Sequence, residues 1–208
     1  MANFRFLTAR RAIGLRQWCA CFGVAIASIS SVAQADTTNV PVSATILPPI
    51  TLSEPAEMRF GTIASGPTAG NLTLSLPATL PSTAPTTLSP MITGNRTRTG
   101  GVVMIGGGVC SATVNCGAGS ILVTGPVSGT FSTVTLPASV TLSSGADTLT
   151  VDTLRKRYGA LGTAGVTTGS GAFSATGDGI VILTGRLVVG ASQAAGSYTG
   201  TMVVTVDY

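Results

Sequence analysis

The sequence contains no histidine, a single lysine and only seven acidic residues among its 208 positions. The absence of histidine excludes a Ser-His-Asp triad and acid–base catalysis by an imidazole. The lysine, Lys156, lies between two arginines at the end of an apparent strand, which favours a surface position over a Ser–Lys catalytic pair. These absences predict that the protein is not an enzyme.

The acidic and aromatic residues are too few for the other sites that we considered. Glycoside hydrolysis needs two carboxyl groups about 5–10 Å apart in a cleft that grips sugar, and only six aromatic residues follow position 35. Calcium needs several carboxylate oxygens, whereas the turn at 177–179 offers one aspartate. Zinc needs about four cysteine or histidine ligands, and only two cysteines and no histidine follow position 35. We therefore expect no cofactor and no metal.

The N-terminal residues have the composition of a secretory signal. Four arginines precede an uncharged apolar stretch that ends at Val32, and Ala-Gln-Ala at 33–35 has the small-x-small pattern read by signal peptidase. We expect residues 1–35 to be removed by cleavage between Ala35 and Asp36. The apolar stretch is shorter than the roughly 20 residues that cross a bilayer, so no membrane span is expected. The pair Arg10-Arg11 keeps a twin-arginine route as an alternative to general secretion.

Removal of the signal also removes the excess of positive charge. All four of its arginines leave, so residues 36–208 carry seven basic and seven acidic side chains. Nucleic-acid-binding proteins gather Lys and Arg on one face, because neutralising phosphates supplies most of their affinity. Here only residues 155–157 form a basic run, and we expect no nucleic-acid partner.

Two cysteines remain after the signal, Cys110 and Cys116. In an exported chain, a pair at this spacing indicates one local disulfide formed in an oxidising compartment. We expect the disulfide to staple a Gly-rich loop at 106–119.

The rest of the sequence is dominated by two-residue alternation of apolar and polar side chains. Because successive side chains of a strand point to opposite sides of a sheet, this pattern is typical of half-buried strands. The clearest example is a terminal strand at 197–208. Its inward face is predicted to carry Tyr198, Met202, Val204, Val206 and Tyr208.

Further strands are expected near 40–47, 58–63, 72–76, 102–105, 121–124, 131–136, 148–154 and 180–189. The last is predicted to be central, with a bend or bulge at Gly185. Short strands separated by Gly and Pro turns predict an all-β fold, an antiparallel β-sandwich forming a single domain over 36–208. Four prolines predict an exposed loop at 77–90.

Five stretches, taken together and in order, carry a family resemblance. They are ATILPPI at 44–50, MRFGTI at 58–63, GNRT at 94–97 with GGV at 100–102, GRLVVG at 185–190 and AGSYTG at 195–200. In these stretches the chain resembles the bacterial DUF4402 family, which is similar to spore-coat-U-type subunits of archaic chaperone–usher pili. The Pro-rich segment and the cysteine loop depart from the family pattern. The resemblance implies an immunoglobulin-like sandwich that is incomplete by one strand.

The resemblance also implies how subunits join and which partners they meet. Each subunit's missing strand is supplied first by a periplasmic chaperone and then by the N-terminal extension of the next subunit, with an outer-membrane usher at the site of assembly. Main-chain hydrogen bonds and alternate side chains in pockets hold such a donor strand. The candidate donor residues here are Val40, Val42, Ala44 and Ile46. The alternative is that 40–47 is the first edge strand of the chain's own sandwich, where Pro41 is tolerated.

We therefore expect a structural subunit of an extracellular fimbria, assembled by donor-strand complementation from copies of itself or related subunits. It would pass through the periplasm to the cell surface. The alternative is a self-complete secreted or surface-associated domain for binding or adhesion. In that case the loops at 77–90 and 106–119 would contact the ligand.

Overall fold

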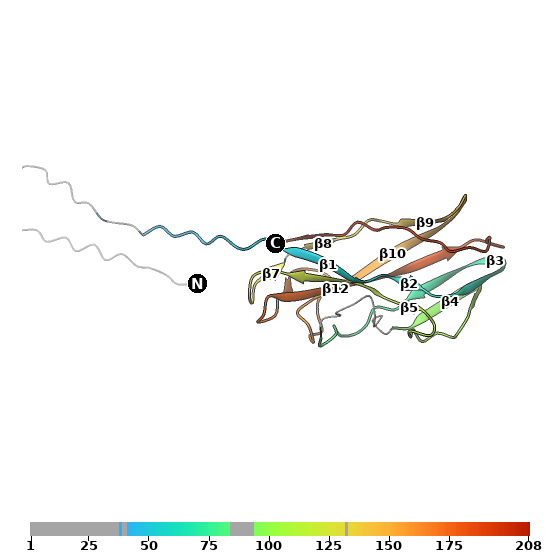
Figure 1. The fold of residues 1–208 in the computed structure, drawn as a ribbon, viewed down its shortest axis with the longest axis horizontal. Coiled ribbons are helices and arrows are strands. Elements are labelled where there is room, and N and C mark those ends of the chain that lie inside the picture. The colour runs from blue at the N-terminus through green and yellow to red at the C-terminus, as the bar shows by residue number, and fades with distance from the viewer. Residues whose placement is uncertain (1–37, 39–40, 84–93, 132) are drawn as a thin grey trace, which may run out of the picture. The chain divides into compact units, whose positions relative to one another are not determined.

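The computed structural model describes residues 38, 41–83, 94–131 and 133–208, and it divides the chain into two compact units, Met1–Ala44 and Thr45–Tyr208. The expected signal peptide, its cleavage residues Ala35 and Asp36, and Val40 lie outside the described residues. Every described strand belongs to the second unit (Figure 1). The sequence led us to expect one domain over 36–208, and the unit that holds the described strands spans Thr45–Tyr208.

The second unit is an all-β domain with thirteen strands among its described residues. They are β1 (Thr51–Ala56), β2 (Arg59–Phe60), β3 (Ile63–Leu74), β4 (Arg96–Met104), β5 (Cys116–Gly117), β6 (Gly119–Thr124), β7 (Thr130–Phe131), β8 (Thr133–Thr135), β9 (Val140–Ser144), β10 (Asp147–Gly159), β11 (Gly171–Ala172), β12 (Asp178–Val189) and β13 (Thr205–Asp207). The described part of the chain holds no helix long and apolar enough to cross a membrane.

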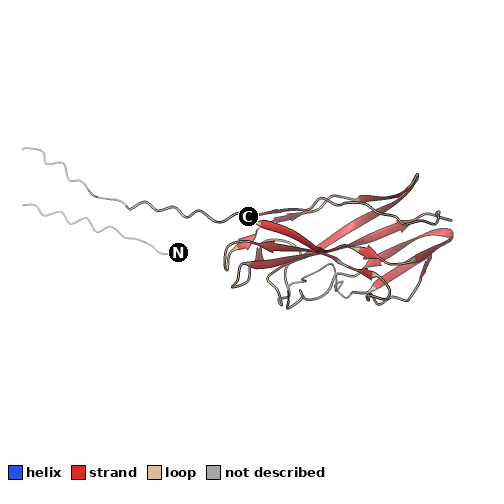
Figure 2. Cartoon of the chain, in the orientation of Figure 1, coloured by secondary structure: helices blue, strands red, loops and turns tan. Residues whose placement is uncertain are grey.

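Seven strands form one antiparallel sheet around β12. One edge of β12 pairs with β10, while the other pairs first with β6 and then, beyond Thr184, with β3. The sheet continues from β6 to β1, from β10 to β9 and from β3 to β4. The pairs β2–β5, β7–β11 and β8–β13 form separate two-stranded sheets, and the sheets together curl into a half-barrel (Figure 2).

The central strand β12 is buried on both faces, which explains why its sequence is apolar without alternation. Alternate residues of 180–183 contribute to two different core clusters. Gly185 lies opposite a bulge in β10 between Asp152 and Arg155. A Cβ at Gly185 would come within 2.8 Å of the Cγ1 atom of Val151. The bulge that we expected at Gly185 therefore lies in the partner strand β10, whose side chains pack closely against this glycine.

Three clusters of buried side chains form the core. The first core cluster consists of Phe60, Leu72, Leu74, Val102, Cys110, Cys116, Val140, Leu149, Val151, Leu187 and Val189. The second core cluster consists of Val123, Phe131, Val134, Tyr158, Phe173, Val181 and Leu183. The outer cluster, on the other face of β12, consists of Leu80, Ala118, Ile180 and Ile182.

The structure corrects four expectations about strands and loops. Of the terminal strand expected at 197–208, only β13 is formed, with an isolated bridge at Thr199. Residues 41–47 lie in no strand, so their interpretation as the first edge strand is wrong, and the first strand is β1. The loop expected at 77–90 is described as far as residue 83 and is not wholly exposed, because Leu80 is 3% exposed in the outer cluster. The loop expected at 106–119 is shorter, because β5 and the start of β6 occupy its end.

Candidate functional site

The inward side of the edge strand β1 is incompletely covered. Leu52 pairs directly with Val123 of β6, so both side chains lie on the same side of the sheet. Val123 is completely buried in the second core cluster, whereas Leu52 is 47% exposed. Within the described residues, β1 pairs with β6 along one edge and with no strand along the other. This is the arrangement expected where a neighbouring strand is missing.

The C-terminal segment, 198–208, lies over the same core cluster. Met202, Val204 and Val206 are half-buried and pack against the second core cluster, while Tyr198 packs against the first. The side chains between them are exposed, and Val203 is 79% exposed. Tyr198, Met202, Val204 and Val206 thus point inward, and Tyr208 is 44% exposed.

Among the described residues, the backbone of this segment is hydrogen-bonded to neighbouring strands only near its two ends. Thr199 and Ser143 of β9 exchange two backbone hydrogen bonds, with N···O distances of 2.8 and 3.1 Å. Farther along, β13 pairs with β8. Between these points, residues 200–204 form no backbone hydrogen bond with the described part of the chain. The backbone here has unused donors and acceptors beside an incompletely covered core.

The C-terminus also reaches the start of β1. The hydroxyl of Tyr208 donates a hydrogen bond to the carbonyl oxygen of Pro48, and Figure 1 shows the C-terminus beside the beginning of β1. Ile50, between Pro48 and β1, is half-buried against the second core cluster. We define the apolar stripe as the partly exposed side chains that β1, the residue just before it and the C-terminal segment contribute here: Ile50, Leu52, Met202, Val204 and Val206.

The candidate donor residues do not form a strand where they are described. Val40 lies outside the described residues. Val42 and Ala44 belong to the first unit, are exposed and have no assigned secondary structure. Ile46 belongs to the second unit and is 93% exposed.

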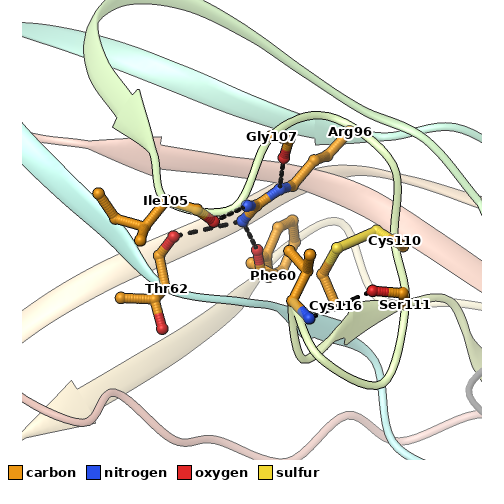
Figure 3. Close-up of a disulfide and its surroundings, with 9 residues drawn as sticks. Phe60, Thr62, Arg96, Ile105, Gly107, Cys110, Ser111 and Cys116 are labelled. Atoms are coloured by element: carbon orange, nitrogen blue, oxygen red, sulfur yellow. Dashed lines mark hydrogen bonds between the residues drawn. A yellow bond between two sulfur atoms is a disulfide. The ribbon is translucent and has the colours of Figure 1, made fainter.

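A buried arginine, Arg96, holds together two backbone segments beside the first core cluster. Arg96, the first residue of β4, is 2% exposed. Its guanidinium donates hydrogen bonds to the carbonyl oxygens of Phe60 (2.8 Å), Thr62 (3.3 Å), Gly107 (2.8 Å) and Ile105 (Figure 3). Burial lowers the pKa of the Arg96 guanidinium. Among the described residues, no carboxylate pairs with it, so backbone dipoles alone stabilise its charge.

The disulfide between Cys110 and Cys116 is formed beside this arginine (Figure 3). Both cysteines are at most 2% exposed and belong to the first core cluster. Asn115, inside the disulfide loop, accepts a hydrogen bond of 2.9 Å from the Arg59 side chain. Because Arg96 binds the backbone just before the loop, the loop is fixed by one covalent bond and two arginines.

Two of the acidic side chains, those of Asp152 and Glu57, have arginine partners. Asp152 and Arg186 form a two-point ion pair across β10 and β12, with both N···O distances 2.8 Å. Glu57 pairs with Arg59 at 3.0 Å. The described residues contain no group of three or more His, Cys, Asp or Glu side chains that could hold a metal ion.

Sequence reasoning missed Ile50, Leu52 and Arg96. The segment TLSEPA of β1 has little alternation, so nothing in it indicated an edge strand with an inward leucine. Arg96 stands in the GNRT stretch quoted for the family resemblance, and an arginine inside such a stretch in a chain of so little charge was the available signal.

The comparisons with known proteins identify one family. The model described as "Domain of unknown function (DUF4402)" matches residues 92–208. This range includes Arg96, the disulfide and the C-terminal segment, but not β1. No curated protein and no solved structure matches the chain.

Proposed function

The chain belongs to the DUF4402 family, and on that premise we propose that it is a structural subunit of an extracellular fimbria, joined to its neighbours by donor-strand complementation. The β domain would be an immunoglobulin-like sandwich that lacks one strand. A periplasmic chaperone would supply that strand during export, and the N-terminal extension of another subunit would replace it during assembly at an outer-membrane usher.

The observation that carries this proposal is the apolar stripe. Its side chains lie beside two stretches of backbone that have no hydrogen-bonded partner within the described part of the chain: the outer edge of β1 and residues 200–204. A strand inserted between them would find hydrogen-bonding groups on both sides and partly exposed aliphatic side chains beneath. Burying three large aliphatic side chains and one alanine of a donor would contribute on the order of 5–8 kcal/mol.

Tyr198 favours the immunoglobulin-like form of the sandwich. Its hydroxyl donates a hydrogen bond of 2.8 Å to the carbonyl of Ala194, four residues earlier, and accepts one of 2.9 Å from Gln193. Immunoglobulin-like domains have a tyrosine near the start of a late strand whose hydroxyl bonds to the backbone a few residues upstream. Tyr198 has this contact at the start of the last segment.

Two double variants of the candidate donor segment test the proposal. Val42→Asp/Ile46→Asp places charges on the face predicted to be buried in the neighbouring subunit, whereas Ser43→Asp/Thr45→Asp places the same charges on the opposite face. The chain purified after export should form ladders that resist dissociation in warm SDS. The first variant should abolish these ladders and the second should retain them.

Two results would refute the proposal. The first is a wild-type chain that is a fully folded monomer without any chaperone, which would instead support the self-complete binding domain. The second is a Val42→Asp/Ile46→Asp variant that assembles as well as the wild type. Deleting residues 36–43 should give the same loss of assembly while the β domain still folds with a chaperone.

A further inference from the structure

We propose that Pro48 and Pro49 prevent the N-terminal segment from completing its own domain, and so reserve it for a second copy of this chain. This inference rests on the proposed function and adds what keeps the donor segment from pairing with its own domain. Residues 45–47 lie just before β1, which pairs with β6 along one edge and with no described strand along the other, yet they lie in no strand themselves. Ile46 and Leu47 are 93% and 53% exposed.

Without such a block, self-completion would compete strongly with assembly. A segment attached directly to an edge strand reaches that edge at a high effective concentration, because the chain itself holds the two together. A short hairpin loop would be enough to fold it back antiparallel to β1. A subunit that closed in this way would have no open edge left for a neighbour.

Of a three-residue and a two-residue hairpin loop before β1, only the three-residue loop would turn the side chains of Ile46 and Ala44 toward the core. Directly opposite residues of an antiparallel pair share a face of the sheet. A three-residue loop at 47–49 would set Ile46 opposite Ile50 and Ala44 opposite Leu52, both on the side of the apolar stripe. A two-residue loop at 48–49 would set Thr45 opposite Leu52 and turn Ile46 to the outside, because a shift of one residue exchanges the faces.

The two prolines exclude both loops on stereochemical grounds. The three-residue loop is a type I turn followed by a left-handed residue, and the proline ring keeps Pro49 at a φ near −65°. The turn also needs residues 47 and 48 in the α region, which is disfavoured for both because each precedes a proline. The two-residue loops need a positive φ at their first residue, which Pro48 cannot adopt.

The contact between Tyr208 and Pro48 also opposes formation of this hairpin. The Tyr208 hydroxyl binds the carbonyl oxygen of Pro48, so the backbone is held at the position where a hairpin would have to reverse. The rigidity of Pro48 and Pro49 and this contact together oppose the chain reversal that would pair residues 45–47 with β1.

The test replaces the prolines with residues that permit the loop. In Pro48→Asn/Pro49→Gly, asparagine suits the second position of a type I turn and glycine suits the left-handed position. We expect this variant to lose the SDS-resistant ladders of the wild type, to elute as a monomer and to melt at a higher temperature. The matched control is Pro48→Val/Pro49→Val, which also removes both rings but resists positive φ because valine is β-branched. It should keep the ladders.

The outcomes separate this inference from the proposed function. A wild-type chain without ladders refutes the proposed function. Wild-type ladders that persist undiminished in Pro48→Asn/Pro49→Gly overturn the inference alone, and so does a loss of ladders in the valine control. A synthetic peptide of residues 38–47 gives a second readout: the loop-permitting variant should bind it at least tenfold more weakly than wild-type monomer released from its chaperone. The single variant Pro49→Gly, a smaller perturbation of folding, should reduce the ladders by at least half, and unchanged ladders would again overturn the inference.

Discussion

Replacing Arg96 with methionine should be among the most destabilising single changes in the domain. The substitution keeps an unbranched side chain of similar length and removes all of the guanidinium's hydrogen bonds. Four carbonyl oxygens from two separate segments would each lose a hydrogen bond at once, although that of Thr62 keeps one of 3.2 Å from the backbone N–H of Ile105. The segments are the link from β2 to β3, at residues 60–62, and the link after β4, at residues 105–107.

The expected loss of unfolding free energy follows from how deeply those oxygens are buried. A buried acceptor left without a partner costs about 1–3 kcal/mol, and the hydrogen bond to Phe60 is buried whereas the other three are partly buried. Water can satisfy the partly buried oxygens in part, and removing a buried cation recovers some of its desolvation cost. We therefore expect a loss of about 3–5 kcal/mol, a large share of the roughly 5–15 kcal/mol that keeps a domain folded. Lysine should not rescue the site, because one ammonium cannot reproduce the planar fork of donors.

Urea unfolding of the isolated variants, followed by circular dichroism, measures this loss. Arg98→Met is the matched control: the same substitution two residues along β4, at an exposed arginine with one hydrogen bond of 2.9 Å to Val102. It should cost less than about 1 kcal/mol. An Arg96→Met protein within about 1 kcal/mol of the wild type, or no less stable than Arg98→Met, would refute the assignment of Arg96 as an organiser of the core.

Three further predictions follow from local geometry. Gly61→Ala should lower the free energy of unfolding by about 2–5 kcal/mol in thermal unfolding, because Gly61 has a φ of +75° and an added Cβ would lie 2.7 Å from a backbone oxygen. Its control, Gly107→Ala, should cost only about 1–2 kcal/mol, because Gly107 has a φ of +89° but no atom within 4 Å of its Cβ position. Equal losses of stability in the two variants would contradict this reasoning. The hydrogen bond from its arginine partner holds the pKa of Asp152 below its ordinary value, so the ion pair stabilises the fold above about pH 4 and this contribution is lost as the pH falls through the folded-state pKa. The small stability difference between wild type and Asp152→Asn, measured from pH 7 to 2, should therefore vanish at the acid end, and a difference independent of pH would be inconsistent with it. Replacing Cys110 and Cys116 with alanine should cost about 2–3 kcal/mol in urea unfolding, and a double variant as stable as the wild type would show that the loop is held by its arginines alone.

The long central strand and the disulfide were predictable because their signals are local. A continuous apolar run flanked by Gly-Asp-Gly indicates a strand buried on both faces, and β12 is that strand. The two cysteines are close enough in sequence to pair almost wherever the rest of the chain goes. The general all-β character follows from the same local alternation and from the frequency of turn residues.

The position of the first strand was not predictable, because two different causes produce the same pattern. Alternation at 40–47 is expected of an edge strand and equally of a segment that pairs with another molecule. The strand β1, with Ser, Glu and Pro in TLSEPA, has weaker alternation than the segment before it. What selects β1 is its pairing with β6, a contact between residues far apart in sequence.

Arg96 escaped sequence analysis for a related reason. An arginine in a polar stretch indicates a solvent-exposed side chain, since charged residues are rarely buried without a partner. Its partners here are main-chain carbonyls, which every residue possesses and which therefore leave no trace in the sequence. Only the folded chain brings residues 60–62 and 105–107 to the same guanidinium.

The distribution of these contacts explains how a domain with an incompletely covered core can remain folded. The first core cluster is closed by the disulfide, by Arg96 and by the long pairing of β3 with β4. The second is covered in part by a C-terminal segment whose backbone hydrogen bonds to the described strands lie near its two ends. Because stability is not uniform across a structure, firm closure of one cluster can maintain the fold while the other keeps an edge available. The disulfide and the buried arginine both belong to the neighbourhood of the first cluster, whereas the second cluster lies beside the edge of β1 that has no partner strand among the described residues.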